Sequence, residues 1–382
     1  MTVWLRLMVA LSLVAASLAG CQGKELTGPA DGTDRFVFQT DHELAVVDGV
    51  TVVARLPRGT ADPVAARIPV TEDGRFLYAL GESSVSVLDT ASLRRTEIPC
   101  AGPCPRVSLG ASLVGWFDAA ADTDHAWAAV HAIDLAAAEP TPSTLGRIRL
   151  PRPGPATAPY SYFLDATPGQ YLFFATDADT PDTAPLWEQP QTLYRAQLDG
   201  TTTDLGRYDG FARAIDVWAV VDPGGNRVML NSGSPDPTHP CAADPGYAPL
   251  DVIDLASGHT IRIHPPAPGS RRHLRATRAW WGNNGTAYVA YRPAGCGTDD
   301  SEDGPPPSVW AYQDGSWSQL DTGGPAIFAL PLAGGRLAVV APAGRTDEVP
   351  HGTLMFIDAE GHRTHIADGV TAIAPLPARP AG

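Results

Sequence analysis

The strongest constraint on this chain is a short pattern that recurs along most of its length. An apolar strand-like run ends at an aspartate, a small turn follows, and a second strand-like run begins. The seven aspartates lie 41, 45, 65, 55, 60 and 44 residues apart, and they are Asp48, Asp89, Asp134, Asp199, Asp254, Asp314 and Asp358. We expect their side chains to accept hydrogen bonds from nearby backbone amides, as aspartates in turns do. The pattern predicts repeated small antiparallel sheets and few long helices.

A second recurring signal is a tight turn that precedes an apolar strand in five of the repeats. The turns are Asp73-Gly74, Pro168-Gly169, Gly224-Gly225, Asn284-Gly285 and Gly334-Gly335. Glycine and asparagine tolerate the positive φ that such hairpins need. Repeats of this length with several short strands are typical of β-propeller blades.

The two ends of the repeat region predict how the ring closes. The first repeat has only three strand-like runs, whereas a lone run at 370–376 follows the last repeat. We expect this C-terminal strand to join the N-terminal blade, which would remove a free sheet edge. The prediction is one β-propeller of seven four-stranded blades over residues 35–377, followed by a tail at 378–382. The repeat at 106–150 matches weakly, so six or eight blades also fit.

The second repeat, residues 66–98, resembles the repeats of bacterial YVTN-type and WD40-like β-propellers. The resemblance covers nearly the whole repeat region in pattern, but only this repeat in detail. Members of that broad group are mostly binding or scaffolding proteins, and some are enzymes. The resemblance therefore implies the fold and leaves the function open.

Residues 1–20 have the features of a targeting segment. Arg6 precedes an apolar run at 7–17 that is too short for a permanent membrane helix but suits a signal peptide. The sequence Leu18-Ala19-Gly20-Cys21 resembles the lipobox of bacterial lipoproteins. That resemblance implies a signal peptide at 1–20, lipidation of Cys21 with acyl chains such as palmitate, and a linker at 21–34. An ordinary secretory signal with an incidental cysteine is the alternative.

This anchor predicts an extracytoplasmic protein held on the cell membrane. Gln22 follows the cysteine, so an aspartate retention signal is absent and an outer-membrane location fits a cell with two membranes. The four other cysteines are an even number in an oxidising compartment, which predicts disulfides. Cys100 and Cys104 are close enough to bridge a short loop, and Cys241 would then pair with Cys296.

The net charge excludes two classes of partner. It is −15 for the chain and −16 without residues 1–20. Such a protein repels nucleic acid and anionic headgroups, so we expect membrane contact through the lipid anchor only. The sequence indicates no cofactor, although calcium is compatible with its acidity. The expected molecule is a monomeric propeller whose partner is an envelope protein or a small ligand.

Four long segments join the expected second and third strands of repeats four to seven, at 177–191, 232–249, 292–307 and 341–352. In a propeller such segments share one face, which we expect to be the binding surface. Its candidate residues are Asp177, Asp179, Asp182, His239, Asp299, Asp300 and His351. Clustered carboxylates can bind calcium, but dense like charges are more often simply solvated. Loops that vary in length without any function are the alternative.

Catalytic motifs are missing from the sequence. It contains no Gly-x-Ser-x-Gly elbow, no His-Glu-x-x-His pair and no phosphate-binding glycine loop. We expect Trp280 and Trp281 to be core and rim residues rather than a stacking platform for sugars. The leading hypothesis is a membrane-anchored binding or scaffolding module. The alternatives are an extracytoplasmic hydrolase or lyase with its site at the central channel, and a purely structural envelope protein.

Overall fold

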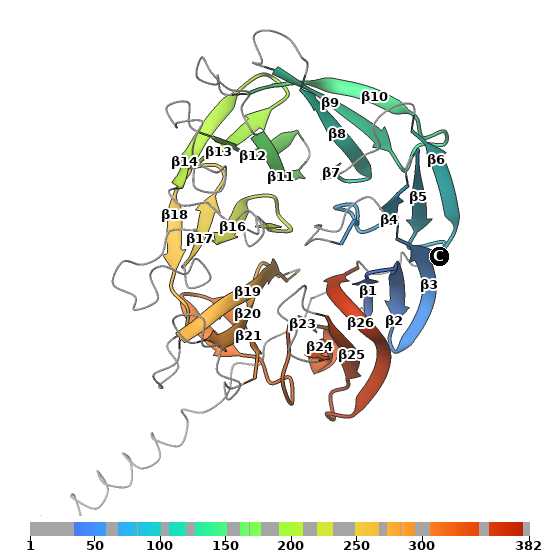
Figure 1. Cartoon of the computed structure of the whole chain (residues 1–382), viewed down its shortest axis with the longest axis vertical. Coiled ribbons are helices and arrows are strands. Elements are labelled where there is room, and N and C mark those ends of the chain that lie inside the picture. Colours follow the sequence, from blue (N-terminus) through green and yellow to red (C-terminus); the bar gives the residue numbers. More distant parts are fainter. Residues whose placement is uncertain are drawn as a thin grey trace, which may run out of the picture.

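The strand-like runs of the sequence form 26 β-strands in the part of the chain that the computed structural model describes. That part comprises residues 34–58, 68–81, 83–100, 107–119, 127–150, 161–167, 169–176, 191–208, 220–231, 249–266, 273–282, 284–294, 306–343 and 351–376. Paired strands are antiparallel, and the sheets surround a central axis (Figure 1). The fold is a single all-β propeller. Among these residues, no helix is long and apolar enough to cross a membrane.

Four of the sheets have four strands each, in chain order. The first sheet contains β7 (Val107–Gly110), β8 (Leu113–Ala119), β9 (Trp127–Asp134) and β10 (Pro142–Arg149). The second contains β11 (Ser161–Thr167), β12 (Gln170–Thr176), β13 (Gln191–Gln197) and β14 (Thr202–Tyr208). The third contains β15 (Val220–Val221), β16 (Arg227–Asn231), β17 (Leu250–Asp254) and β18 (Thr260–Ile263). The fourth contains β19 (His273–Trp281), β20 (Ala287–Ala294), β21 (Ser308–Gln313) and β22 (Ser316–Gln319).

The two remaining sheets have three and seven strands. The three-stranded sheet contains β4 (Phe76–Leu80), β5 (Ser84–Asp89) and β6 (Arg95–Pro99). The seven-stranded sheet contains, in spatial order, β23 (Phe328–Pro331), β24 (Leu337–Pro342), β25 (Gly352–Ile357), β26 (Arg363–Pro375), β1 (Arg35–Thr40), β2 (Glu43–Asp48) and β3 (Thr51–Pro57). A short 3-10 helix, Ala333–Gly335, joins β23 to β24.

The expectation of seven separate four-stranded blades is wrong in that form, because the described strands make six sheets. The 13-residue strand β26 pairs with β25 through its first half and with β1 through its second half, so it fuses the first and last repeats. In the second repeat, the expected inner strand is reduced to one bridge between Val70 and Leu77. The expected pairing of the C-terminal strand with the N-terminal repeat is confirmed: Val37 lies opposite Ala374.

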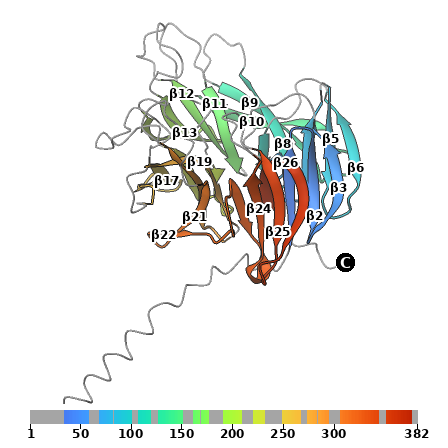
Figure 2. The same cartoon turned by 60° about the horizontal axis from the view of Figure 1, so that its bottom comes forward.

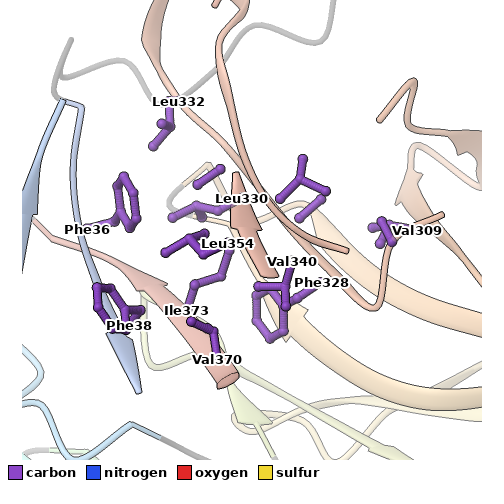
Figure 3. Close-up of a cluster of buried hydrophobic side chains, with 14 of the residues drawn as sticks. Phe36, Phe38, Val309, Phe328, Leu330, Leu332, Val340, Leu354, Val370 and Ile373 are labelled. Carbon is purple, nitrogen blue, oxygen red and sulfur yellow. The ribbon is translucent and has the colours of Figure 1, made fainter. Parts of the chain in front are cut away.

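The core lies between neighbouring sheets, because each sheet is covered on both faces. Alternate residues of β1 show this directly. Phe36 and Phe38 belong to the apolar cluster that includes β23, β24 and β25, whereas Val37 packs toward the β4–β6 sheet. Figure 3 shows the first cluster, in which Phe36, Phe38, Leu354 and Ile373 lie close together. A strand that is buried on both faces carries the apolar runs seen in the sequence.

The turn residues behave as the sequence predicted. Asp89, Asp134, Asp199, Asp254 and Asp358 each accept a hydrogen bond from a backbone N–H two or three residues later. The glycines that end the five tight turns have φ between 66° and 75°, a conformation that side-chain-bearing residues rarely adopt. These local bonds fix the turns and account for five of the seven recurring aspartates.

Candidate functional site

The strand order places the long connecting segments at one face of the ring. Consecutive strands are antiparallel, so the segment joining the second and third strands of a sheet leaves from the opposite end to the segment joining the third and fourth. The four long segments join β12 to β13, β16 to β17, β20 to β21 and β24 to β25, which are second and third strands. Figure 2 shows the sheets standing side by side around the axis. The strand ends that bear these segments therefore share one face.

Most of the predicted site residues lie outside the described residues. Eight of them fall on the long segments, namely Asp177, Asp179, Asp182, His239, Cys241, Cys296, Asp299 and Asp300, and the other two are Cys21 and Cys104. The predicted lipidation, the disulfides and the binding role of the acidic residues stay predictions.

Two of the predicted residues, Cys100 and His351, are described. Cys100 follows β6, its N–H donates to the carbonyl oxygen of Ser83 at 2.9 Å, and its side chain packs on the cluster between the β4–β6 and β7–β10 sheets. His351 is exposed just before β25, and its carbonyl oxygen accepts a bond from Ala343 N–H at 3.3 Å. His351 thus lies where its segment meets the predicted binding face.

The described residues also bring together a polar group that the sequence did not single out. Arg278 of β19 donates from Nη1 to the carbonyl oxygen of Thr371 in β26. Its guanidinium carbon lies 5.6 Å from the centroid of the Phe328 ring in β23. The side chain of Gln39 in β1 contacts the same threonine, since Nε2 donates to Thr371 Oγ1 at 3.4 Å. We call Arg278, Thr371, Gln39 and Phe328 the Arg278 cluster.

This cluster lies at the axis side of the ring. The first strands of successive sheets approach one another there, with β7 near β11, β11 near β15 and β15 near β19 (Figure 1). Within the seven-stranded sheet, β23 also contacts β26. Arg278 starts on one such strand and reaches Thr371, passing the Phe328 ring of the strand between them. Arg278 is enclosed but keeps partial solvent exposure, whereas Gln39, Thr371 and Phe328 are buried.

Irregular strand pairing positions both ends of the Arg278–Thr371 contact. In β19, Ala276 and Arg278 face consecutive residues of β20, so Thr277 is an extra residue that forms a β-bulge. In β26, Thr371 is the extra residue in the same way, between the pairs Val370–Thr40 and Ala372–Gln39. A bulge leaves backbone groups out of the ladder and re-aims side chains, and bulges are frequent beside functional sites. Here a bulge frees the Thr371 carbonyl oxygen to accept the arginine.

The electrostatics of Arg278 differ from those of two other arginines that link sheets. Arg35 donates to Thr90 O and lies 3.9 Å from Asp48, and Arg227 donates to Gly285 O and lies 3.0 Å from Asp222. Within the described part of the chain, Arg278 has no carboxylate in ion-pair range, and its interactions are those with Thr371 and Phe328. Burial lowers the pKa of Arg278 to about 10, so the side chain remains a cation at neutral pH.

Aromatic packing holds the platform beneath the arginine. The rings of Trp280 and Phe328 are stacked with their centroids 4.0 Å apart. Tyr288 is also stacked on Trp280, with a centroid distance of 6.0 Å. Trp280 is 8% exposed, which fits the expected core role better than an open sugar-stacking surface. Its indole N–H is buried and has no hydrogen-bond partner among the described residues.

A cluster of three titratable side chains lies at the face of the ring opposite to the long segments. Ligand atoms of Asp358, Glu360 and His362 lie within 4.8 Å of one another in the turn between β25 and β26. The turn accounts for this arrangement, because Asp358 Oδ1 accepts the N–H groups of Glu360 and His362, and His362 Nδ1 is 3.0 Å from Asp358 Oδ2. Glu360 and His362 are exposed and the geometry is local, so we assign no metal site here.

Comparisons with known proteins support the fold. No protein-family model matches the sequence, and no curated protein matches it. Among solved structures, the acylaminoacyl peptidase of Pyrococcus horikoshii is 13% identical with a TM-score of 0.50, over 87% of this chain and 50% of that chain. Oligogalacturonate lyase from Vibrio parahaemolyticus is 10% identical with a TM-score of 0.46, over 88% of this chain and 86% of that chain. AztD from Citrobacter koseri is 11% identical with a TM-score of 0.42, over 89% and 96%.

These likenesses concern the architecture only. This chain spans half the length of the Pyrococcus peptidase, and the identities are far too low to carry over an activity. The same fold supports many unrelated functions, so the function has to be argued from the site.

Proposed function

We propose that this protein is a lipid-anchored, extracytoplasmic β-propeller that binds a protein or small-ligand partner on one face. The observation that carries this proposal is the strand topology. A closed ring, in which β26 joins β1, presents the ends of all four pairs of strands that bear the long segments on the same side. A rigid scaffold that displays several loops together is a common way to build a binding surface.

The chemistry of the Arg278 cluster favours binding over acid–base catalysis. It combines a permanent cation with two neutral polar side chains, Thr371 and Gln39. General acid–base catalysis needs a group whose pKa lies near the operating pH, which none of these three provides. A site of this kind can hold an anion but cannot accept a proton.

The anchor is supported by the residues that precede Cys21. Two or three acyl chains hold a soluble domain stably at a bilayer, whereas a single chain gives only marginal binding. Replacing Cys21 with Ser is expected to move the protein from the membrane fraction to the soluble fraction of the envelope. Retention of the Cys21→Ser protein in the membrane fraction would refute lipid anchoring.

The binding face is tested by cross-linking in intact cells followed by mass spectrometry of what is captured. In one variant, residues 177–190 and 295–305 are replaced by short Gly-Ser turns. The matched control shortens the turn at 135–141, which joins β9 to β10 at the opposite face. We expect a specific partner with the natural protein and with the control, but not with the face variant. Equal capture by the face variant and the control would contradict the proposed face.

A further inference from the structure

We infer that the Arg278 cluster is an oxyanion site, which takes the carboxylate or phosphate group of a small ligand at the axis of the ring. This inference rests on the proposed binding function but not on the membrane anchor. It assigns a charge and a place in the fold to a ligand that the sequence leaves undefined.

The first argument is the cost of the uncompensated charge. Enclosing a guanidinium costs solvation free energy that an opposite charge normally offsets, and buried charges in proteins are therefore usually paired. Arg35 and Arg227 follow that rule through Asp48 and Asp222. Among the residues that the structure describes, the partners of Arg278 are instead one neutral carbonyl oxygen and one aromatic ring. An anionic ligand would supply the missing charge.

The second argument is the number of donors that remain. A guanidinium carries five N–H donors in a planar fork that matches the two oxygens of a carboxylate or phosphate. The contact with Thr371 uses one donor on Nη1, and no described residue accepts the others. Arg278 keeps partial solvent exposure, and its strand β19 is the one of its sheet nearest the axis (Figure 1).

The third argument is that the protein fixes the orientation of the fork before any ligand binds. The Thr371 carbonyl oxygen holds Nη1, and the Phe328 ring lies below the guanidinium. Thr371 is held in turn, because its hydroxyl donates to Gln39 O at 3.2 Å and accepts from Gln39 Nε2 at 3.4 Å. A preorganised group loses less conformational entropy on binding.

The net charge of the protein limits the ligand class. The protein has a net charge of −15 and therefore repels polyanions over long range. A single cation at the axis cannot hold a highly charged polymer against that repulsion. One guanidinium matches one oxyanion group. A small carboxylate or phosphate ligand therefore fits better than a nucleic acid.

The test is titration calorimetry of the purified full-length protein with acetate and with inorganic phosphate, at ionic strength held constant with chloride. We expect saturable one-to-one binding that falls at least tenfold in Arg278→Met. The matched control is Arg147→Met, which removes an exposed arginine of β10 and is expected to leave binding unchanged. Whichever of the two anions binds more tightly identifies the group as carboxylate or phosphate.

Two results would overturn the inference. One is the absence of saturable binding of either anion to the natural protein, and the other is equal affinity of the natural protein and Arg278→Met. If Arg278→Met does not fold, Arg278→Lys keeps the charge but loses the fork, and its affinity is expected to drop several-fold. Partner capture in cells is measured on the same variants. Capture that persists without anion binding overturns this site while leaving the proposed binding function intact.

Discussion

Because β26 closes the ring, we expect that shortening one buried side chain of this strand, in the substitution Ile373→Ala, destabilises the whole protein. Ile373 lies opposite Phe38 of β1, is 3% exposed and belongs to the apolar cluster shared by β1, β23, β24 and β25 (Figure 3). Replacing it with Ala removes buried methyl and methylene groups and leaves a cavity. Substitutions of this type cost about 2–5 kcal/mol of unfolding free energy. Because native proteins are stable by only about 5–15 kcal/mol, the loss is a large share of the total.

The matched control is Ile261→Ala in β18, where the isoleucine is 51% exposed. Both variants replace isoleucine with alanine in a strand, so the intrinsic strand preference is lost in each and the difference reports burial. Beyond the lost strand preference, which both variants share, we expect Ile261→Ala to lower the unfolding free energy by roughly 0.5 kcal/mol or less.

The assay is urea unfolding followed by tryptophan fluorescence and far-UV circular dichroism. A true loss of native stability lowers the urea midpoint while the slope m stays unchanged. A difference of about 2 kcal/mol between the variants corresponds to roughly a thirtyfold change in the ratio of folded to unfolded protein. Unfolding free energies of the two variants that agree to within about 0.5 kcal/mol would show that the β26–β1 closure does not hold the ring together.

Two further predictions concern packing and titration. An added Cβ at Gly115 would overlap the carbonyl oxygen of His131, which cannot move, so Gly115→Ala should lose about 1–3 kcal/mol in urea unfolding. Gly146→Ala, which meets only a flexible side chain at 3.1 Å, should be nearly neutral, and equal losses would contradict this account. Burial raises the pKa of Tyr171 and Tyr288 to about 12. Their contribution to stability is therefore complete below pH 10 and lost as the pH rises toward 12, and absorbance at 295 nm should show fewer ionised tyrosines in native than in unfolded protein at pH 11.

Local chemistry explains which parts of the fold could be predicted. An aspartate that accepts backbone N–H groups two or three residues later needs only its own neighbours, so Asp89 and Asp254 were identifiable as turn residues. These bonds lower the pKa of Asp254 through the hydroxyl and backbone N–H of Ser257. The strands could be predicted for the same reason, because the alternation of apolar residues is also a pattern of neighbouring residues.

The partition of strands into sheets could not be derived in this way. It depends on how far β26 continues beyond its pairing with β25, and on whether residues near Val70 form a full strand or a single bridge. Both outcomes are decided by tertiary contacts that a repeat pattern does not contain.

The Arg278 cluster was missed for a related reason. The bulge at Thr277 interrupts the two-residue alternation of β19, so Arg278 does not stand out as a residue on a definite face. Its partner Thr371 lies 93 residues further along the chain. A cation two residues before Trp280, at the start of the apolar end of β19, was the one signal that could have drawn attention to it.

The double pairing of β26 also has a consequence for how the protein is made. Residues 370–375 pair with the edge of β1, which is the first of the described strands to be synthesised. Until the last strand arrives, the first repeat has an unpaired edge, and unpaired edges recruit other chains. Folding can therefore finish only after nearly the whole chain has been synthesised. A chain arrested before residue 370 would keep the edge of β1 unpaired and would therefore be prone to aggregation.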